Sequence, residues 1–181
     1  MQLKYKHNLL IVDDEESILK SLQRLFRNEN FEIRTATSGI DGLILIRDEK
    51  TSFSLVIADQ RMPEMTGAQF LAEARKLLPD TMRVLLTGYS DMDAIVDAIN
   101  DGGIHRYLTK PWKDEDLLLQ VHQVLEQYEL ILENRRLMEL TKKQNEELVS
   151  LNSSLEQRVR GKTAEIIKGC LLYTSPSPRD S

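Results

Sequence analysis

Five polar side chains stand where short apolar runs of the chain end, and their chemical types suit the handling of phosphate. The runs and the residues that follow them are NLLIV before Asp13 and Asp14, SLVIA before Asp59, RVLL before Thr87, and HRYLT before Lys110. Carboxylates can hold a hard cation such as Mg²⁺, which accepts phosphate oxygens as further ligands. A hydroxyl and an ammonium can bind other oxygens of the same phosphate and neutralise its charge. We therefore take these five residues as the candidate functional site.

These side chains meet only if the apolar runs are strands of one parallel sheet. Short apolar runs separated by helix-length segments are typical of parallel strands that are buried on both faces. In such a sheet the carboxyl ends of the strands gather at one edge, and ligands bind in the crevice there. We therefore expect the five residues to converge on one small pocket.

The elements that must position the site alternate between strand and helix over the first 112 residues. This alternation predicts an α/β fold, a doubly wound five-stranded parallel sheet of the flavodoxin-like order 2-1-3-4-5, followed by a long C-terminal helix. We expect strands at about Asn8–Asp13, Phe31–Ala36, Leu55–Asp59, Arg83–Thr87 and Arg106–Thr109. We expect helices at about Ser17–Asn28, Gly39–Glu49, Ala68–Leu78 and Met92–Asp101, with Ser38, Thr66 and Asp91 at helix starts.

Among the acids, Asp59 is the candidate nucleophile. A carboxylate can attack phosphorus and form an aspartyl phosphate. In the expected strand order the third strand is central and lies beside the first strand at the switch point. The irregular segment QRMPEMTG follows Asp59 and leaves its carboxylate accessible. Without a cation the neighbouring acids repel one another, so we expect the cation-free pocket to be the less stable state.

Composition excludes several classes of protein. The 24 basic and 29 acidic side chains give a net charge of -5, which argues against a nucleic-acid-binding surface. A single cysteine rules out an internal disulfide framework. The first apolar run is too short for a signal peptide or a membrane span, so we expect a cytoplasmic protein without membrane contact. The three histidines lie far apart and lack metal-ligand spacing.

The chain beyond the fifth strand reads as one long helix. Leu148, Leu151 and Leu155 follow a 3-then-4 rhythm, and after a one-residue phase shift Val159, Lys162 and Ile166 continue it. A single helix cannot bury such a stripe, so we expect a parallel coiled coil, and thus a homodimer, through the C-terminal helix. The polar residues Thr141, Gln144 and Asn145 interrupt the stripe, and a solvated helix is the alternative for 133–147.

The last residues fit nothing before them. Pro176 and Pro178 are expected to end the helix and to leave a disordered terminus. The string Cys170–Asp180 is similar to the translation of a sequencing adapter, so we exclude it from functional reasoning and expect the natural protein to continue beyond Lys168 into an output domain. The expected organisation is a domain at 1–125, a coiled-coil signalling helix at 126–168 and an artefactual tail at 169–181.

Four segments together resemble the receiver domain of bacterial two-component response regulators. They are IVDDEE at 11–16, VIADQRMPEMTG at 56–67, LLTG at 85–88 and YLTKPW at 107–112, and the resemblance covers about residues 7–125. It implies that Asp59 is the phosphoacceptor and that Mg²⁺ is the cofactor. It also implies a ligand set in which Asp14 and Asp59 bind the metal directly, Asp13 acts through water, and the backbone carbonyl of Arg61 contributes.

The same resemblance implies a switch. Thr87 is expected to hydrogen-bond a phosphoryl oxygen and Lys110 to pair with the phosphoryl group, while Gly88 leaves room beside it. Tyr107 occupies the family's switch position, where the aromatic ring moves inward once Thr87 has turned. The Lys110–Pro111 bond is expected to be cis. The segment LNSSLEQRVRGKTAEI resembles signalling helices that join receivers to output domains.

The phosphodonor is expected to be a phosphohistidine on a partner sensor histidine kinase, because the chain has no glycine-rich nucleotide-binding loop. We therefore expect a signalling receiver that is an enzyme only toward its own phosphorylation and dephosphorylation. One alternative is a coiled-coil dimerisation adaptor with a vestigial receiver. The other is a phosphohydrolase with an aspartyl nucleophile, although such enzymes favour a DxD motif and Asp59 is followed by Gln60-Arg61.

Any of several output domains could follow such a receiver. A cyclic-dinucleotide phosphodiesterase or cyclase, a histidine kinase and a DNA-binding domain all fit a receiver joined to a helical linker, and we favour the phosphodiesterase. Each motif also has a plainer explanation in isolation: Asp13-Asp14 could cap a helix, Thr87-Gly88 could be a turn, and Tyr107 could simply pack. The conjunction of five matched positions, each at a predicted strand end, favours the receiver.

Overall fold

The computed structural model describes residues 3–48, 50–101 and 103–173, and its centre is a five-stranded sheet in the order β2-β1-β3-β4-β5. All neighbouring strands are parallel. The strands are β1 (His7–Val12), β2 (Phe31–Ala36), β3 (Leu55–Asp59), β4 (Met82–Thr87) and β5 (Arg106–Thr109). The predicted fold class and strand order are confirmed.

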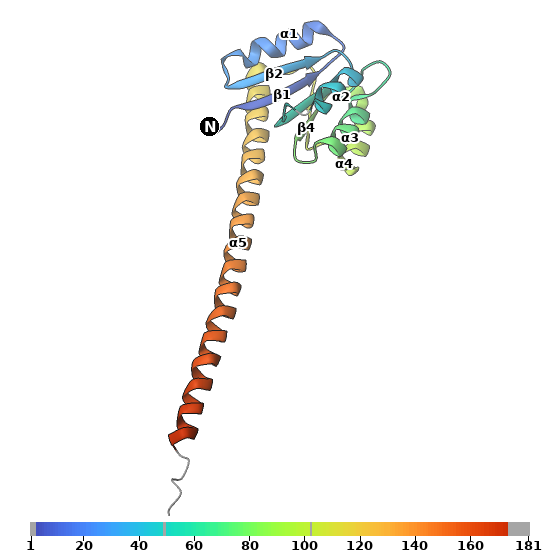
Figure 1. Ribbon diagram of the computed structural model, residues 1–181. Coiled ribbons are helices and arrows are strands. Elements are labelled where there is room, and N and C mark those ends of the chain that lie inside the picture. The colour runs from blue at the N-terminus through green and yellow to red at the C-terminus, as the bar shows by residue number, and fades with distance from the viewer. Residues whose placement is uncertain (1–2, 49, 102, 174–181) are drawn as a thin grey trace, which may run out of the picture. The chain divides into compact units, whose positions relative to one another are not determined.

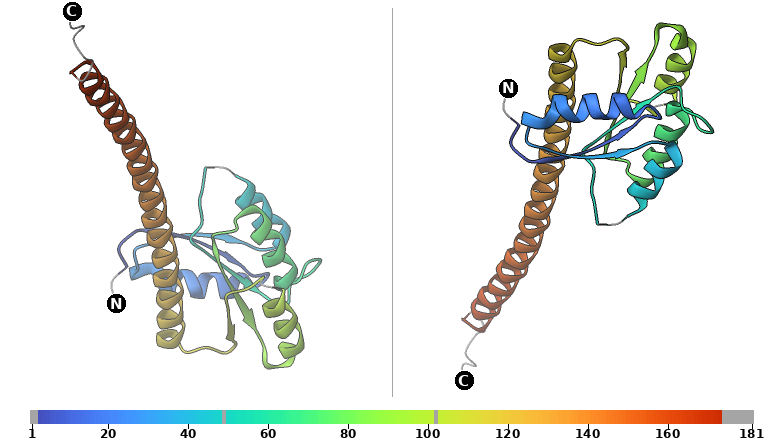
Figure 2. Two further views of the ribbon diagram at one scale, coloured as in Figure 1. Left: turned by 90° about the horizontal axis from the view of Figure 1, so that it is seen from below. Right: turned by 90° about the horizontal axis from the view of Figure 1, so that it is seen from above.

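Helices cover both faces of the sheet, with α1 and the start of α5 on one face and α2, α3 and α4 on the other (Figures 1 and 2). Their bounds are α1 (Glu16–Leu25), α2 (Gly39–Arg47), α3 (Gly67–Leu77), α4 (Met92–Asn100) and α5 (Asp114–Tyr173), with short 3₁₀ turns η1 (Phe26–Asn28) and η2 (Tyr89–Asp91). The first predicted helix therefore ends earlier than expected, because a 3₁₀ turn follows Leu25. Glu49, the predicted end of α2, lies outside the described residues.

The apolar runs identified in the sequence are the central strands of this sheet. Along β1, Leu9 and Ile11 pack with α1 and α5, whereas Leu10 and Val12 pack with α2 and α3. All four side chains are fully buried. Burial on both faces is the physical reason that the run shows no alternation of polar and apolar residues. The same burial fixes the strand ends, which carry the functional side chains.

Two of the three predicted helix caps form. Ser38 accepts a hydrogen bond from the backbone N–H of Asp41, and Thr66 forms a capping box with Gln69 at the start of α3. Asp91 stands before α4 but makes no side-chain cap hydrogen bond. Its carboxylate is bound by Arg61 instead.

The chain divides into two compact units, Met1–Leu132 and Glu133–Ser181, and the division falls within helix α5. Tyr128 and Glu129 lie within the first unit, where Glu129 contacts His7. The domain boundary predicted at residue 125 stays a prediction. Residues 169–173 are helical, so they differ from the predicted disordered tail. The remainder of that tail, with Pro176 and Pro178, lies outside the described residues.

No helix among the described residues combines the length and the apolarity that a membrane crossing requires.

Candidate functional site

The three acids predicted to form the site lie together at the carboxyl edge of the sheet. Asp13 directly follows β1, and Asp59 is the last residue of β3. Ligand atoms of Asp13, Asp14 and Asp59 all lie within 4.8 Å of one another. Asp13 and Asp59 are buried, whereas Asp14 is exposed. The cluster is therefore closed at its base and open to solvent on the side of Asp14.

Lys110 inserts its ammonium among these acids. Its Nζ lies 2.8 Å from Asp59 Oδ1 and 3.1 Å from Asp13 Oδ2. Its backbone N–H donates to the carbonyl of Thr87, which places the residue after β5 beside the end of β4. Since Asp13 is completely buried, the ammonium is what offsets its charge in the folded chain.

Burial and neighbouring charges shift the pKa values of this pair. Burial raises the pKa of Asp59, and the charges of Asp13 and Asp14 raise it further, while the hydrogen bond and the charge of Lys110 oppose that rise. The pKa of Lys110 is also raised: burial, the largest single effect, lowers it, but the hydrogen bonds to Asp59 and Asp13 and the charges of these two acids together outweigh burial. The lysine is therefore charged and holds the central carboxylate in an otherwise unfavourable environment.

Thr87 lies on β4, which pairs with β3, and Tyr107 lies on the edge strand β5, which pairs with β4. Thr87 is fully buried at the end of β4, and its Oγ1 donates a hydrogen bond to the carbonyl of Gly88 at 3.1 Å. Tyr107 on β5 is 37% exposed. A Cβ added to Gly88 would meet no atom within 4 Å, so the space beside this residue is open. The Lys110–Pro111 bond is cis, as expected from the sequence.

The segment after Asp59 is fixed by contacts that sequence reasoning did not identify. A Cβ on Gly67 would lie 2.2 Å from the carbonyl oxygen of Asp59, so α3 begins in direct contact with the backbone of the central acid. The backbone N–H of Gly67 donates to the carbonyl of Gln60, and the N–H of Ala68 donates to the Gln60 side chain. The buried glycine that opens α3 is the only sequence signal for this close approach.

The Arg61 side chain contacts the turn that precedes α4. The guanidinium binds Asp91 and Ser90, which precede α4. The pKa of Asp91 is lowered by this hydrogen bond, and the pKa of Arg61 is raised by Asp91 first and also by the charge of Asp59. The partners are 30 residues apart in the chain, so no local pattern predicts the pair. The predicted role of the Arg61 backbone carbonyl stays a prediction.

The acidic cluster fits a divalent cation. Its donors are carboxylate oxygens, the ligands that hard cations prefer, and their spacing allows more than one to reach the same ion. The exposed side chain of Asp14 leaves a route for a hydrated ion to enter. Magnesium keeps several waters and binds few carboxylates, which matches so open a cluster.

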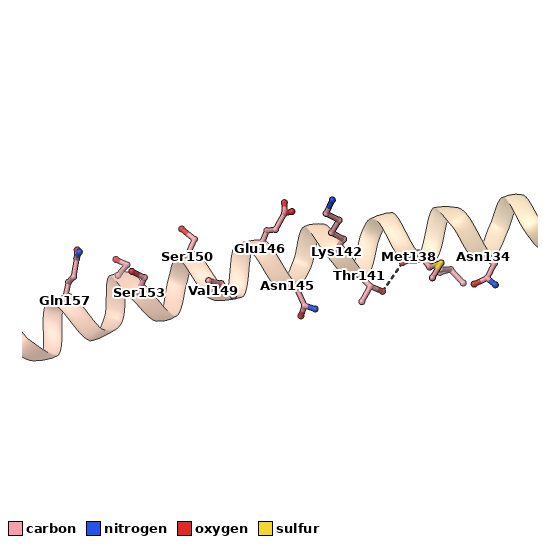
Figure 3. Close-up of a pocket in the computed structure, with 12 residues that line it drawn as sticks. Asn134, Met138, Thr141, Lys142, Asn145, Glu146, Val149, Ser150, Ser153 and Gln157 are labelled. Carbon is pink, nitrogen blue, oxygen red and sulfur yellow. Dashed lines mark hydrogen bonds between the residues drawn. The ribbon is translucent and has the colours of Figure 1, made fainter.

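A hollow also lies along the unit that begins at Glu133. All of its lining residues, from Asn134 to Gln157, come from the single helix α5 (Figure 3). Thr141 uses its hydroxyl to hydrogen-bond the carbonyl of Leu137 one turn earlier. One helix alone cannot enclose a ligand, so this strip is an exposed helix face and not a binding cavity.

Comparison with known proteins agrees with the geometry. Residues 9–122 match the family model of the response regulator receiver domain. The chain is 35% identical over 122 residues to the hydrogenase transcriptional regulatory protein HoxA of Bradyrhizobium diazoefficiens, an alignment that covers 67% of this chain and 24% of that protein. The chain therefore spans about a quarter of the length of the curated relatives it matches.

Two solved structures extend the comparison. The adenylate cyclase of Rhodopirellula baltica matches with a TM-score of 0.70 and 31% identity, over 75% of this chain and 98% of that one. An uncharacterized protein from Neptuniibacter caesariensis matches with a TM-score of 0.68 and 45% identity, over 72% of this chain and 96% of that one. The matched family model covers the strands and loops that carry the acidic cluster. The chain belongs to the response regulator receiver domain family of two-component systems.

Proposed function

We propose that Asp59 accepts a phosphoryl group from a phosphohistidine on a partner sensor histidine kinase. The observation that carries this assignment is the position of the Asp59 carboxylate, 2.8 Å from the ammonium of Lys110 and beside Asp13 and Asp14 at the sheet edge. Among the clustered acids it is the one that lies on the central strand β3. Asp13 already has hydrogen bonds from the Lys110 ammonium and from the backbone N–H of Glu15, which suits a positioning role.

In the proposed reaction a carboxylate oxygen of Asp59 forms an O–P bond while the N–P bond of the donor breaks and the imidazole leaves. Transfer of this kind depends mostly on positioning and on neutralisation of charge. Lys110 neutralises charge on the carboxylate and then on the phosphoryl oxygens. Burial of Asp59 keeps water away from the nucleophile, although it also raises the pKa of the carboxyl.

Mg²⁺ is the proposed cofactor. Asp14 and Asp59 would hold the ion directly, Asp13 through a water molecule, and the backbone carbonyl of Arg61 would complete the protein ligands. When bound, the ion supplies positive charge that offsets the phosphoryl oxygens and the three acids. The exposed side chain of Asp14 is the entry side for this ion.

Thr87 and Tyr107 form the proposed switch. In the present arrangement the Thr87 hydroxyl is donated to the carbonyl of Gly88, so it must rotate to reach a phosphoryl oxygen. That rotation leaves space beside β5, and the partly exposed ring of Tyr107 can then move inward. Phosphorylation would thereby shift the population of two arrangements of β4, β5 and α4.

Helix α5 is the proposed route to the output, and we propose that it pairs with α5 of a second copy as a parallel coiled coil. Leu148, Leu151 and Leu155 are 61%, 60% and 52% exposed, and their spacing places them on one stripe. A second copy of the chain would bury this stripe by coiled-coil packing. The relatives are named for outputs as different as transcriptional regulation and adenylate cyclase, so a receiver of this kind does not by itself determine the output.

Phosphotransfer is tested with acetyl phosphate and Mg²⁺ followed by intact mass measurement. The wild-type chain should gain one phosphoryl group, and Asp59→Asn should gain none. Equal modification of both proteins would reject the assignment of Asp59. Multiple turnover of a generic phosphate ester would instead favour the phosphohydrolase.

The homodimer is tested by sedimentation equilibrium with a matched pair of variants. Leu151→Glu places a charge in the leucine stripe and should give a monomer. Ser150→Glu places the same charge one residue earlier, outside the stripe, and should remain dimeric. A monomeric wild-type chain, with and without beryllofluoride, would reject the coiled coil.

A further inference from the structure

The guanidinium of Arg61 joins the loop that follows Asp59 to the turn that precedes α4. Its Nε lies 3.0 Å from Asp91 Oδ2, and its Nη2 lies 2.9 Å from Asp91 Oδ1 and 2.6 Å from Ser90 Oγ. Arg61 stands two residues after Asp59, whereas Ser90 and Asp91 belong to the turn η2 between Thr87 and α4. One side chain therefore connects the loop of the phosphoacceptor to the loop of the proposed switch.

The Asp91 carboxylate binds Arg61 and does not cap helix α4. Asp91 stands at the N-terminus of α4, where its side chain would ordinarily accept a backbone hydrogen bond. It makes no such bond, while Ser38 and Thr66 both cap their helices. The Asp91 side chain is only 16% exposed, and bidentate contact with a guanidinium gives the pair a defined geometry.

Arg61 itself is free to change partners. Its side chain is 70% exposed, so reorientation requires no repacking of the core. Phosphorylation of Asp59 would replace a carboxylate by an acyl phosphate that carries additional negative charge and more acceptor oxygens. Guanidinium groups bind phosphate oxygens in the same forked manner as they bind carboxylates.

We propose that Arg61 exchanges partners during signalling, from Asp91 and Ser90 in the resting receiver to the phosphoryl group on Asp59. This inference rests on the proposed phosphorylation of Asp59. In the resting state the contact holds η2 in place. In the phosphorylated state the loss of this contact frees η2. Arg61 thus acts as a positioning residue that links occupancy of the acidic cluster to the start of α4.

The test measures the affinity of the full chain for beryllofluoride with Mg²⁺ present, followed through the single tryptophan, Trp112. Asp91→Ala removes the resting partner of Arg61 and should tighten binding about two- to fivefold, the range for an exposed ion pair. Asp93→Ala is the matched control, because it removes the same charge from the first turn of α4. It should change binding less than Asp91→Ala does.

Arg61→Gln completes a double-mutant cycle. In that background Asp91→Ala should have no further effect on affinity, because no guanidinium is left to be released. Amide hydrogen exchange of residues 89–91, measured without beryllofluoride, should be faster in both Arg61→Gln and Asp91→Ala than in the wild-type chain.

The outcomes separate this inference from the function on which it rests. If the wild-type chain binds no beryllofluoride, the proposed phosphorylation of Asp59 falls, and the exchange of partners falls with it. If the wild-type chain binds normally but Asp91→Ala matches Asp93→Ala in affinity, the inference alone is overturned. Effects of Asp91→Ala that persist in the Arg61→Gln background would overturn it as well.

Discussion

Gly67 makes the closest contact with the backbone of the proposed phosphoacceptor, so Gly67→Ala tests how tightly the site is built. The added Cβ would lie 2.2 Å from the carbonyl oxygen of Asp59, 2.8 Å from its carbonyl carbon and 2.7 Å from Leu85 Cδ1. Two of these three atoms belong to the backbone of β3, which is paired on both sides. The strand cannot move without disturbing its neighbours.

The expected cost follows from this geometry. Extra volume in a well-packed interior typically costs 1–3 kcal/mol, and more where backbone must shift, so we expect Gly67→Ala to lose about 3 kcal/mol of unfolding free energy. For a domain of this size that corresponds to a fall of about 10 °C in Tm. Displacement of Asp59 relative to Lys110 should also slow phosphorylation by acetyl phosphate at least about tenfold.

Two other glycines provide matched controls. A Cβ on Gly88 would meet nothing within 4 Å, and a Cβ on Gly39 would meet the flexible Met65 side chain at 3.0 Å. Urea unfolding followed by Trp112 fluorescence should therefore rank the losses as Gly88→Ala below Gly39→Ala below Gly67→Ala. If Gly67→Ala unfolds at the same urea concentration as Gly88→Ala, the contact between α3 and the Asp59 backbone is not as described.

Three further predictions concern other parts of the receiver. Lys110→Ala removes the ammonium between Asp13 and Asp59 and should lower the free energy of unfolding by about 2 kcal/mol when Mg²⁺ is absent. Added Mg²⁺ should restore part of this loss, because the ion also offsets the charge of the acids. A loss that Mg²⁺ does not change would contradict this prediction. Glu129→Ala removes the carboxylate oxygen that accepts hydrogen bonds from His7 Nε2 and from the backbone N–H groups of Lys4 and Tyr5. Urea unfolding should show a loss of about 3 kcal/mol in the free energy of unfolding. The control Gln127→Ala, at an exposed position of the same helix, should show little change. The pKa of His105 is lowered to about 4, mainly by partial burial and further by the charges of Arg83 and Arg75. Because the unfolded imidazole titrates near pH 6.5, its contribution to stability is full above that pH and is lost as the pH falls toward 4. An NMR titration that places the His105 pKa near 6.5 would contradict that reading.

The sheet and the positions of the five polar residues could be predicted because a buried strand has a recognisable local sequence pattern. A strand buried on both faces, such as β1 with Leu9 to Val12, reads as an unbroken apolar run, and its end marks the sheet edge. Once the strand order follows from the alternation of elements, the positions of Asp13, Asp59 and Lys110 follow as well. The spacing of their atoms could not be predicted, because it depends on side-chain packing.

The contacts that sequence reasoning missed depend on residues distant in the chain. Asp91 has the sequence signature of a helix cap, but Arg61, 30 residues away, binds its carboxylate more favourably than a backbone N–H does. Glu129 of α5 likewise contacts His7 across 122 positions of the chain. Local patterns give no information on such pairs.

Phosphorylation of Asp59 is the step on which the proposed function depends. The most direct measurement is to treat the chain with acetyl phosphate and Mg²⁺, reduce the acyl phosphate with borohydride, and map the modified residue by peptide mass spectrometry. Reduction converts a phosphorylated aspartate to homoserine, which marks its position in the chain. We predict homoserine at position 59 and none at 13 or 14. Homoserine at another aspartate, or unchanged labelling of Asp59→Asn, would contradict the assignment of Asp59 as the phosphoacceptor.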